Sequence, residues 1–118
     1  MASRLATVIL VAATALPCCG QSAPKPPRWQ VLADCAAAYE ANARTADPDR
    51  PAAMISQVSD VAADYMKAAE AAYPGGPKSR KAAHRRVAAQ VAARARAYGT
   101  RPREAVEAVI DACPQVGG

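Results

Sequence analysis

The 118-residue chain contains no Phe, a single Trp and a single His. Strands collect aromatic and β-branched residues, so a chain this poor in aromatics does not favour a β-sheet. A catalytic cysteine needs a His partner and a zinc site needs four ligands, and His84 alone supplies neither arrangement. There is also no Gly-rich phosphate loop. We therefore expect a protein that is not an enzyme and that uses no cofactor and no metal.

Alanine is what the chain has in abundance, with 32 residues. Alanine has the highest helix propensity, and the Gly and Pro residues gather in a few places instead of interrupting long stretches. The length fits one domain. From Gln21 onward only 18 residues are Val, Ile, Leu, Met, Trp or Tyr. The sequence thus predicts an all-α domain whose thin core needs an additional constraint.

The first 20 residues have the layout of a secretion signal. Arg4 supplies the positive start, and the uncharged apolar stretch Leu5–Leu16 is followed by small residues. Twelve apolar residues are too few to cross a bilayer, which takes roughly 20. We expect the mature protein to be exported to the periplasm or the medium, with no transmembrane span.

Two routes of signal removal stay open. One is ordinary cleavage, either after the Ala13-Thr14-Ala15 triplet or nearer Gly20. The other is lipoprotein processing, because the stretch 16–22 resembles a bacterial lipobox with Leu16 three residues before Cys19. That resemblance implies lipidation of Cys19 and attachment to the outer membrane. The motif usually has Gly, Ala or Ser before the acceptor, where this chain has Cys18.

Four cysteines occur, at positions 18, 19, 35 and 113. Adjacent cysteines rarely bridge each other, because a disulfide needs separated Cα atoms and splayed Cβ vectors. If the first two leave with the signal or carry a lipid, Cys35 and Cys113 remain as one pair in an oxidising compartment. Closing a loop of nearly 80 residues contributes about 4.5 kcal/mol by chain entropy. We expect this disulfide to tie the first helix to the last.

Four helical stretches follow a Pro-rich linker at residues 21–28, within a helical domain expected at residues 29–118. They are predicted at about 27–44, 50–73, 79–98 and 100–113. Asp49, Ser79 and Thr100 are suitable N-caps for the last three helices, and Gly99 is a typical C-cap of the third. Short connections between amphipathic helices indicate a small four-helix antiparallel bundle.

Apolar residues recur at helical spacing in each stretch. The arc of the first helix is Trp29, Val31, Leu32, Cys35, Ala36 and Tyr39. The arc of the second is Met54, Ile55, Val58, Val61, Ala62, Tyr65, Ala69 and Ala72. The third has a narrow stripe of Ala83, Val87, Val91 and Tyr98, and the fourth has Val106, Val109, Ile110 and Cys113. Both candidate disulfide cysteines therefore lie on faces expected to be buried.

Charge is segregated along the chain. Residues 78–103 hold nine Lys or Arg and no acid, whereas residues 28–73 hold seven acids and four bases. One interpretation is an anion-binding surface on the third helix, for an anionic membrane surface or an acidic protein partner. Nucleic acid is not expected, because aromatic residues do not alternate with the bases. The other interpretation is a solvated helix face. The candidate surface comprises Lys78, Arg80, Lys81, Arg85, Arg86 and Arg96.

The acidic residues at helical spacing, Asp60 with Asp64 and Glu104 with Glu107 and Asp111, are expected on solvated faces. Two functions follow from the sequence. The first is an exported envelope protein with a binding or structural role, acting through its basic surface. The alternative is a periplasmic carrier of a small ligand, which would need a pocket above about 300 Å³ lined by Tyr39, Tyr65 and Met66.

Overall fold

A computed structural model describes residues 24–44 and 49–116. It contains the helices α2 (Arg28–Arg44), α3 (Ala52–Ala72), α4 (Arg80–Gly99) and α5 (Arg103–Asp111), and a 3₁₀ turn, η1 (Gly76–Ser79). Within those two ranges there is no strand. The predicted all-α class with four helices is therefore confirmed. The predicted secretion signal and the predicted lipidation site Cys19 lie outside the described residues.

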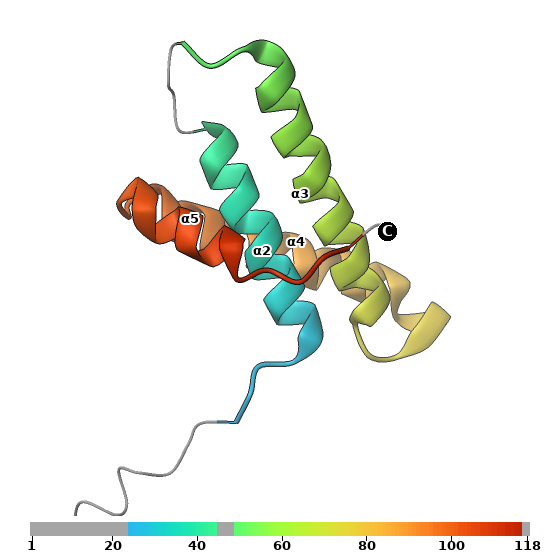
Figure 1. Cartoon of the computed structure of the whole chain (residues 1–118). Coiled ribbons are helices and arrows are strands. Elements are labelled where there is room, and N and C mark those ends of the chain that lie inside the picture. The colour runs from blue at the N-terminus through green and yellow to red at the C-terminus, as the bar shows by residue number, and fades with distance from the viewer. Residues whose placement is uncertain (1–23, 45–48, 117–118) are drawn as a thin grey trace, which may run out of the picture.

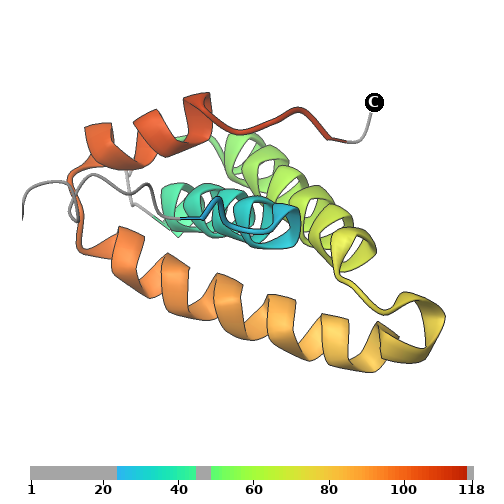
Figure 2. The same ribbon diagram turned by 90° about the horizontal axis from the view of Figure 1, so that it is seen from below.

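Helices α2 and α3 form an antiparallel pair, and α4 and α5 cross this pair on opposite sides of α2. In Figure 1, α3 runs back alongside α2, and α5 runs back along the direction of α4. Figure 2 shows α4 along one side of the molecule, with α2 between α4 and α5. Helix α2 contacts each of α3, α4 and α5, so it is the central element.

Helix α2 is buried on nearly every side. Leu32 and Cys35 are buried together with a series of alanines, which are Ala33, Ala36, Ala37, Ala38 and Ala41. A helix that is apolar around most of its circumference is suited to the centre of a fold, and alanine lets neighbouring helices approach closely. The sequence placed only one arc of this helix in the core. The alanines on its other sides are the reason for its wider burial.

Helix α3 differs from its prediction at its first turns. Met54 and Ile55 were expected in the buried arc, but they are 50% and 38% exposed. The prediction was wrong because α3 has 21 residues against 17 in α2, so the start of α3 extends past the end of α2 (Figure 1). Further along, Ala62, Tyr65 and Ala69 are buried as expected.

The connection between α3 and α4 is a turn that contains two glycines and leads into η1. Gly75 and Gly76 adopt positive φ angles of 115° and 64°, which glycine tolerates without strain. A Cβ on Gly75 would collide with the side chain of Ser79. The Pro-Gly-Gly-Pro segment thus turns the chain and leads into η1, which α4 follows at Arg80.

The residues at the helix ends differ from the expected caps. Pro51, and not Asp49, directly precedes α3, and Ser79 precedes α4 without a side-chain cap hydrogen bond. Gly99 is the last residue of α4 instead of its cap. The Thr100 hydroxyl donates a hydrogen bond to the Ala97 carbonyl, 2.8 Å away, so Thr100 closes α4 and does not start α5.

Helix α5 begins after Pro102, whose fixed φ and missing N–H suit the start of a helix. It ends at Asp111, two residues before Cys113. Cys113 nevertheless keeps helix-like contacts, since its Sγ lies 3.1 Å from the Val109 carbonyl. The predicted fourth helix is therefore shorter at both ends.

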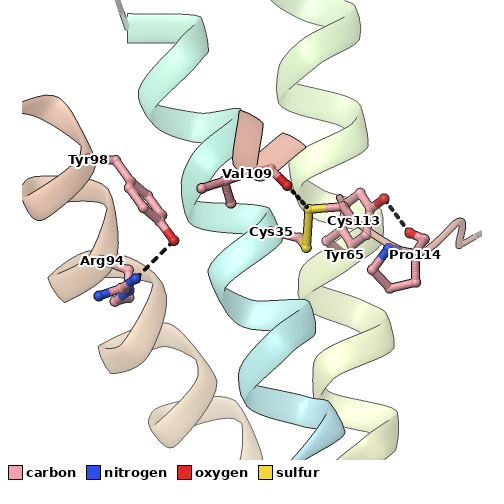
Figure 3. The surroundings of a disulfide bond; sticks show 7 residues. All are labelled: Cys35, Tyr65, Arg94, Tyr98, Val109, Cys113 and Pro114. Atoms are coloured by element: carbon pink, nitrogen blue, oxygen red, sulfur yellow. Dashed lines mark hydrogen bonds between the residues drawn. A yellow bond between two sulfur atoms is a disulfide. The ribbon is translucent and has the colours of Figure 1, made fainter. Parts of the chain in front are cut away.

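The disulfide between Cys35 and Cys113 is present, as predicted. Their Cα atoms lie 5.9 Å apart, within the normal range for a bridge. Figure 3 shows the bond beside α2, with the Tyr65 hydroxyl of α3 donating to the Pro114 carbonyl. The bond and this hydrogen bond together fasten the end of the chain to α2 and α3.

Candidate functional site

All six basic residues of the predicted anion-binding surface are exposed. Lys78 belongs to η1 and the other five to α4. Arg85 and Arg96 lie on the side of α4 opposite its buried stripe, whereas Lys81 and Arg86 lie to its two flanks. Among the described residues, none of the six forms an ion pair within 4.0 Å. Their positive charges are therefore available to a ligand.

The first turns of α4 concentrate positive charge at the wrong end of the helix for its own stability. The first turn contains Arg80 and Lys81 and no acidic residue. The N-terminus of a helix already carries partial positive charge from its free N–H groups, so cations there repel it. Lys81 and Arg85 are also four residues apart, a spacing at which like charges destabilise a helix. A bound anion would relieve both repulsions.

These cations surround a surface hollow of about 450 Å³. Its lining residues are Arg80, Lys81, Arg85, His84 and Glu70. His84 Nδ1 lies 2.9 Å from Glu70 Oε1, which joins α4 to α3 along one edge. The His84 side chain is 67% exposed. Sequence analysis did not identify this contact, because nothing local indicates which residue of α4 faces Glu70.

A polar cluster links α2 to α4. Gln90 Nε2 donates to Asp34 Oδ1 at 2.9 Å, and Arg94 Nε lies 3.3 Å from the same oxygen without the alignment of a hydrogen bond. Arg94 also donates to the Tyr98 hydroxyl at 3.0 Å (Figure 3). That hydrogen bond raises the pKa of Arg94, while burial acts in the opposite direction.

Arg94 therefore differs from the exposed cations of α4, because its guanidinium contacts Asp34 and Tyr98. Arg94 is held by two partners, and Tyr98 is contacted on its ring by both Arg94 and Arg101, at 4.9 and 5.2 Å from the ring centroid. Sequence reasoning did not assign this cluster. The spacing of Gln90, Arg94 and Tyr98 by four residues is the signal that could have indicated one shared face.

The tyrosines expected to line a ligand pocket instead pack against each other. Tyr39 and Tyr65 stack with ring centroids 5.4 Å apart. Burial, and secondarily the neighbouring Tyr39, raise the pKa of Tyr65. Met66 lines a groove of about 440 Å³ between α2, α3 and α4, but neither tyrosine belongs to its lining. The groove described here thus differs from the one that the carrier hypothesis required.

The acidic residues at helical spacing are all exposed, as expected: Asp60, Asp64, Glu104, Glu107 and Asp111. Glu107 accepts from Arg103 at 3.2 Å, an ordinary surface pair between successive turns. Residues 24–44 and 49–116 contain no group of three or more His, Cys, Asp or Glu side chains placed to hold a metal ion. These carboxylates lie on the solvent-exposed faces of α3 and α5.

No protein-family model, no curated protein and no solved structure matches this chain. Among the helices of the described ranges, none is both long enough and apolar enough to cross a membrane. The interpretation of the site therefore rests on the chemistry of its own residues.

Proposed function

We propose that the protein is a small exported envelope protein without enzymatic activity that binds phosphate-bearing anionic surfaces through the start of α4. The observation that carries the proposal is the hollow lined by Arg80, Lys81 and Arg85, none of which has an acidic partner among the described residues. Clustered cations attract anionic lipid headgroups by about 1 kcal/mol each near a membrane surface.

Export is supported by two independent features. The first 20 residues have the charge and apolar pattern of a secretion signal. The Cys35–Cys113 disulfide is the kind of bond that persists in oxidising compartments and is rare in reducing ones. An exported protein of an envelope meets anionic headgroups before any other polyanion, which favours a lipid surface as the ligand over an acidic protein.

The mass of the mature protein from a native-like host tests the export proposal. Ordinary cleavage near Gly20 gives an unmodified chain, and lipoprotein processing gives a chain that begins at a lipidated Cys19. In both cases we expect reduction to add the mass of two hydrogens. A full-length chain with an intact signal, or two free thiols at Cys35 and Cys113, would contradict export.

Binding is tested with vesicles that contain phosphatidylglycerol, and with phosphatidylcholine vesicles as the neutral control. We expect retention on the anionic vesicles at low salt and its loss at about 0.5 M salt, where charges are screened beyond a few ångströms. The variant Lys81→Gln with Arg85→Gln should abolish most of this retention. Equal binding at both salt concentrations, or none at either, would refute the proposal.

A matched control separates the site from net charge. The variant Lys25→Gln with Arg28→Gln removes the same two charges from exposed positions at the start of the described chain. We expect it to bind anionic vesicles nearly as well as the unmodified protein. If both double variants lose binding equally, overall charge and not the α4 cluster is responsible.

A further inference from the structure

An apolar groove lies between α4 and the α2–α3 pair. Its apolar wall is formed by α4 together with Met66 of α3, and charged side chains complete its lining. On the α4 side the lining residues are Ala88, Val91, Ala92 and Ala95. Two charged features mark its rim. Glu40 and Arg44 of α2 pair with each other at 2.6 Å, and Arg96 has no ion-pair partner among the described residues.

This groove continues from the cationic hollow at the start of α4. Glu70 and His84 are in contact at the hollow, near the end of α3 and the start of α4. One turn back along α3 is Met66 and one turn forward along α4 is Ala88, both of which line the groove. The seam between the two helices therefore passes from a cluster of cations into an apolar channel.

Resting on the proposed function, we propose that this seam binds one anionic amphiphile. Its headgroup lies in the hollow by Lys81 and Arg85, and its hydrocarbon chain lies along the groove. A free anion would satisfy the hollow alone and leave the groove without a role. An acidic peptide would place polar backbone groups against the alanine and valine side chains of α4, which offer no hydrogen-bonding partner, and this is costly.

Size and charge fit such a ligand. A volume of about 440 Å³ falls within the range of small-molecule sites. Arg85 and Arg96 are 11 residues apart on α4, which corresponds to about 16 Å and to an extended alkyl chain of roughly a dozen carbons. Cations at both ends disfavour a positively charged amphiphile.

The test measures binding of monomeric dodecyl phosphate by titration calorimetry, below the concentration at which it forms micelles. Two variants differ only in where they place a bulky ring. Ala92 and Ala93 are both exposed positions of α4, but only Ala92 lines the groove. We expect Ala92→Phe to weaken binding about tenfold or more and Ala93→Phe to change it less than about twofold, since an exposed site tolerates substitution. Equal effects of the two substitutions would overturn the proposal.

Chain length gives a second readout. Each added methylene should strengthen binding by roughly two- to fourfold while the groove is filling, and no further beyond about a dozen carbons. A series of alkyl phosphates from eight to sixteen carbons is therefore expected to reach a plateau. A steady gain up to sixteen carbons would indicate partition into a surface and would overturn the proposal. So would equal affinity for dodecyltrimethylammonium, or binding of an acidic helical peptide in place of the amphiphile.

Failure of this inference can be distinguished from failure of the proposed function. If Lys81→Gln with Arg85→Gln weakens vesicle binding while Ala92→Phe leaves dodecyl phosphate binding unchanged, the hollow acts without the groove and only the amphiphile proposal fails. Inorganic phosphate that binds as tightly as dodecyl phosphate has the same meaning. If the cation variants change neither measurement, both proposals fail.

Discussion

Helices α2 and α4 are both rich in alanine, yet they occupy opposite kinds of environment. In α2 the alanines Ala33, Ala36, Ala37 and Ala38 are fully buried. In α4 only Ala83 and Ala95 are buried, while Ala89, Ala92 and Ala93 are exposed. Alanine itself has little preference between the two situations, because it buries little area and loses no side-chain entropy in a helix.

The positions of the charged residues explain why α2 is buried and α4 is exposed. In α2 the bases lie only at the two ends, Arg28 and Arg44, and the acids Asp34 and Glu40 both have partners. In α4 exposed cations occupy the first two turns and return at Arg96. A helix can be surrounded only if no unpaired charge must be desolvated, so α2 becomes the centre and α4 the surface. The α2 alanines therefore serve packing, whereas several α4 alanines lie on its exposed side.

The largest expected effect comes from releasing α2 from the end of the chain. Replacing Cys35 and Cys113 together by Ser opens a loop that spans 78 positions. We expect the free energy of unfolding to fall by about 4.5 kcal/mol on the chain-entropy estimate, a large share of the stability of a small domain. Urea denaturation followed by helical circular dichroism measures this change.

Reductant provides the control for that comparison. It should destabilise the unmodified protein to the level of the double variant and leave the double variant itself unaffected. A loss below about 1 kcal/mol would show that packing around α2, and not the covalent link, holds the last helix in place.

The same enlargement at two alanines tests the contrast directly. Ala37→Leu introduces a larger side chain at a fully buried position of α2 and should destabilise the fold by about 1–3 kcal/mol through overpacking. Ala93→Leu places the same group on the exposed side of α4 and should remain within about 0.5 kcal/mol of the unmodified protein. Similar costs at both sites would mean that α2 is not packed more closely than α4.

How far the sequence predicts this arrangement depends on the kind of contact. Helical spacing identified four helices, the buried stripe of α4 and the position of both disulfide cysteines on inward faces. It did not identify α2 as the central helix, because its alanines fit a core and a surface equally well. It also placed Met54 and Ile55 inside, since periodicity carries no information about where a neighbouring helix ends.

The candidate site shows the same division. The cations of the surface followed from charge counting alone, and all of them are exposed. The hollow, the groove and the contact between Glu70 and His84 join residues of different helices. Such contacts depend on how helices cross, which side-chain periodicity within one helix does not determine.

A smaller effect is expected from cutting the polar link between α2 and α4. Asp34→Ala removes the acceptor of Gln90 and the ion-pair partner of Arg94, and should cost about 1 kcal/mol because both groups are partly solvated. Arg85→Ala on the exposed side of α4 should instead be neutral or stabilise by a few tenths of a kcal/mol, since it relieves repulsion from Lys81.

A double-mutant cycle shows whether the link acts as a unit. Combining Asp34→Ala with Gln90→Ala should cost less than the sum of the single changes, because the two residues share one hydrogen bond. The combination of Asp34→Ala with Arg85→Ala should be additive. Strict additivity in both cycles would indicate that the Asp34–Gln90 contact contributes nothing to holding α4 on α2.

The last and smallest effect is confined to alkaline pH and concerns the side of α2 that faces α3. Burial and the stacked ring of Tyr39 raise the pKa of Tyr65 above its ordinary value near 10. The folded state therefore holds the phenolic proton more tightly than the unfolded state. The contribution of Tyr65 to the free energy of unfolding is complete below about pH 10. It is lost as pH rises through the folded pKa, because the unfolded chain releases the Tyr65 proton first.

We expect the free energy of unfolding to decline more steeply above pH 10 in the unmodified protein than in Tyr65→Phe, which keeps the ring against Tyr39 but cannot ionise. Urea titrations at a series of alkaline pH values measure both slopes, and identical slopes would mean that Tyr65 ionises as readily in the folded state as in the unfolded one.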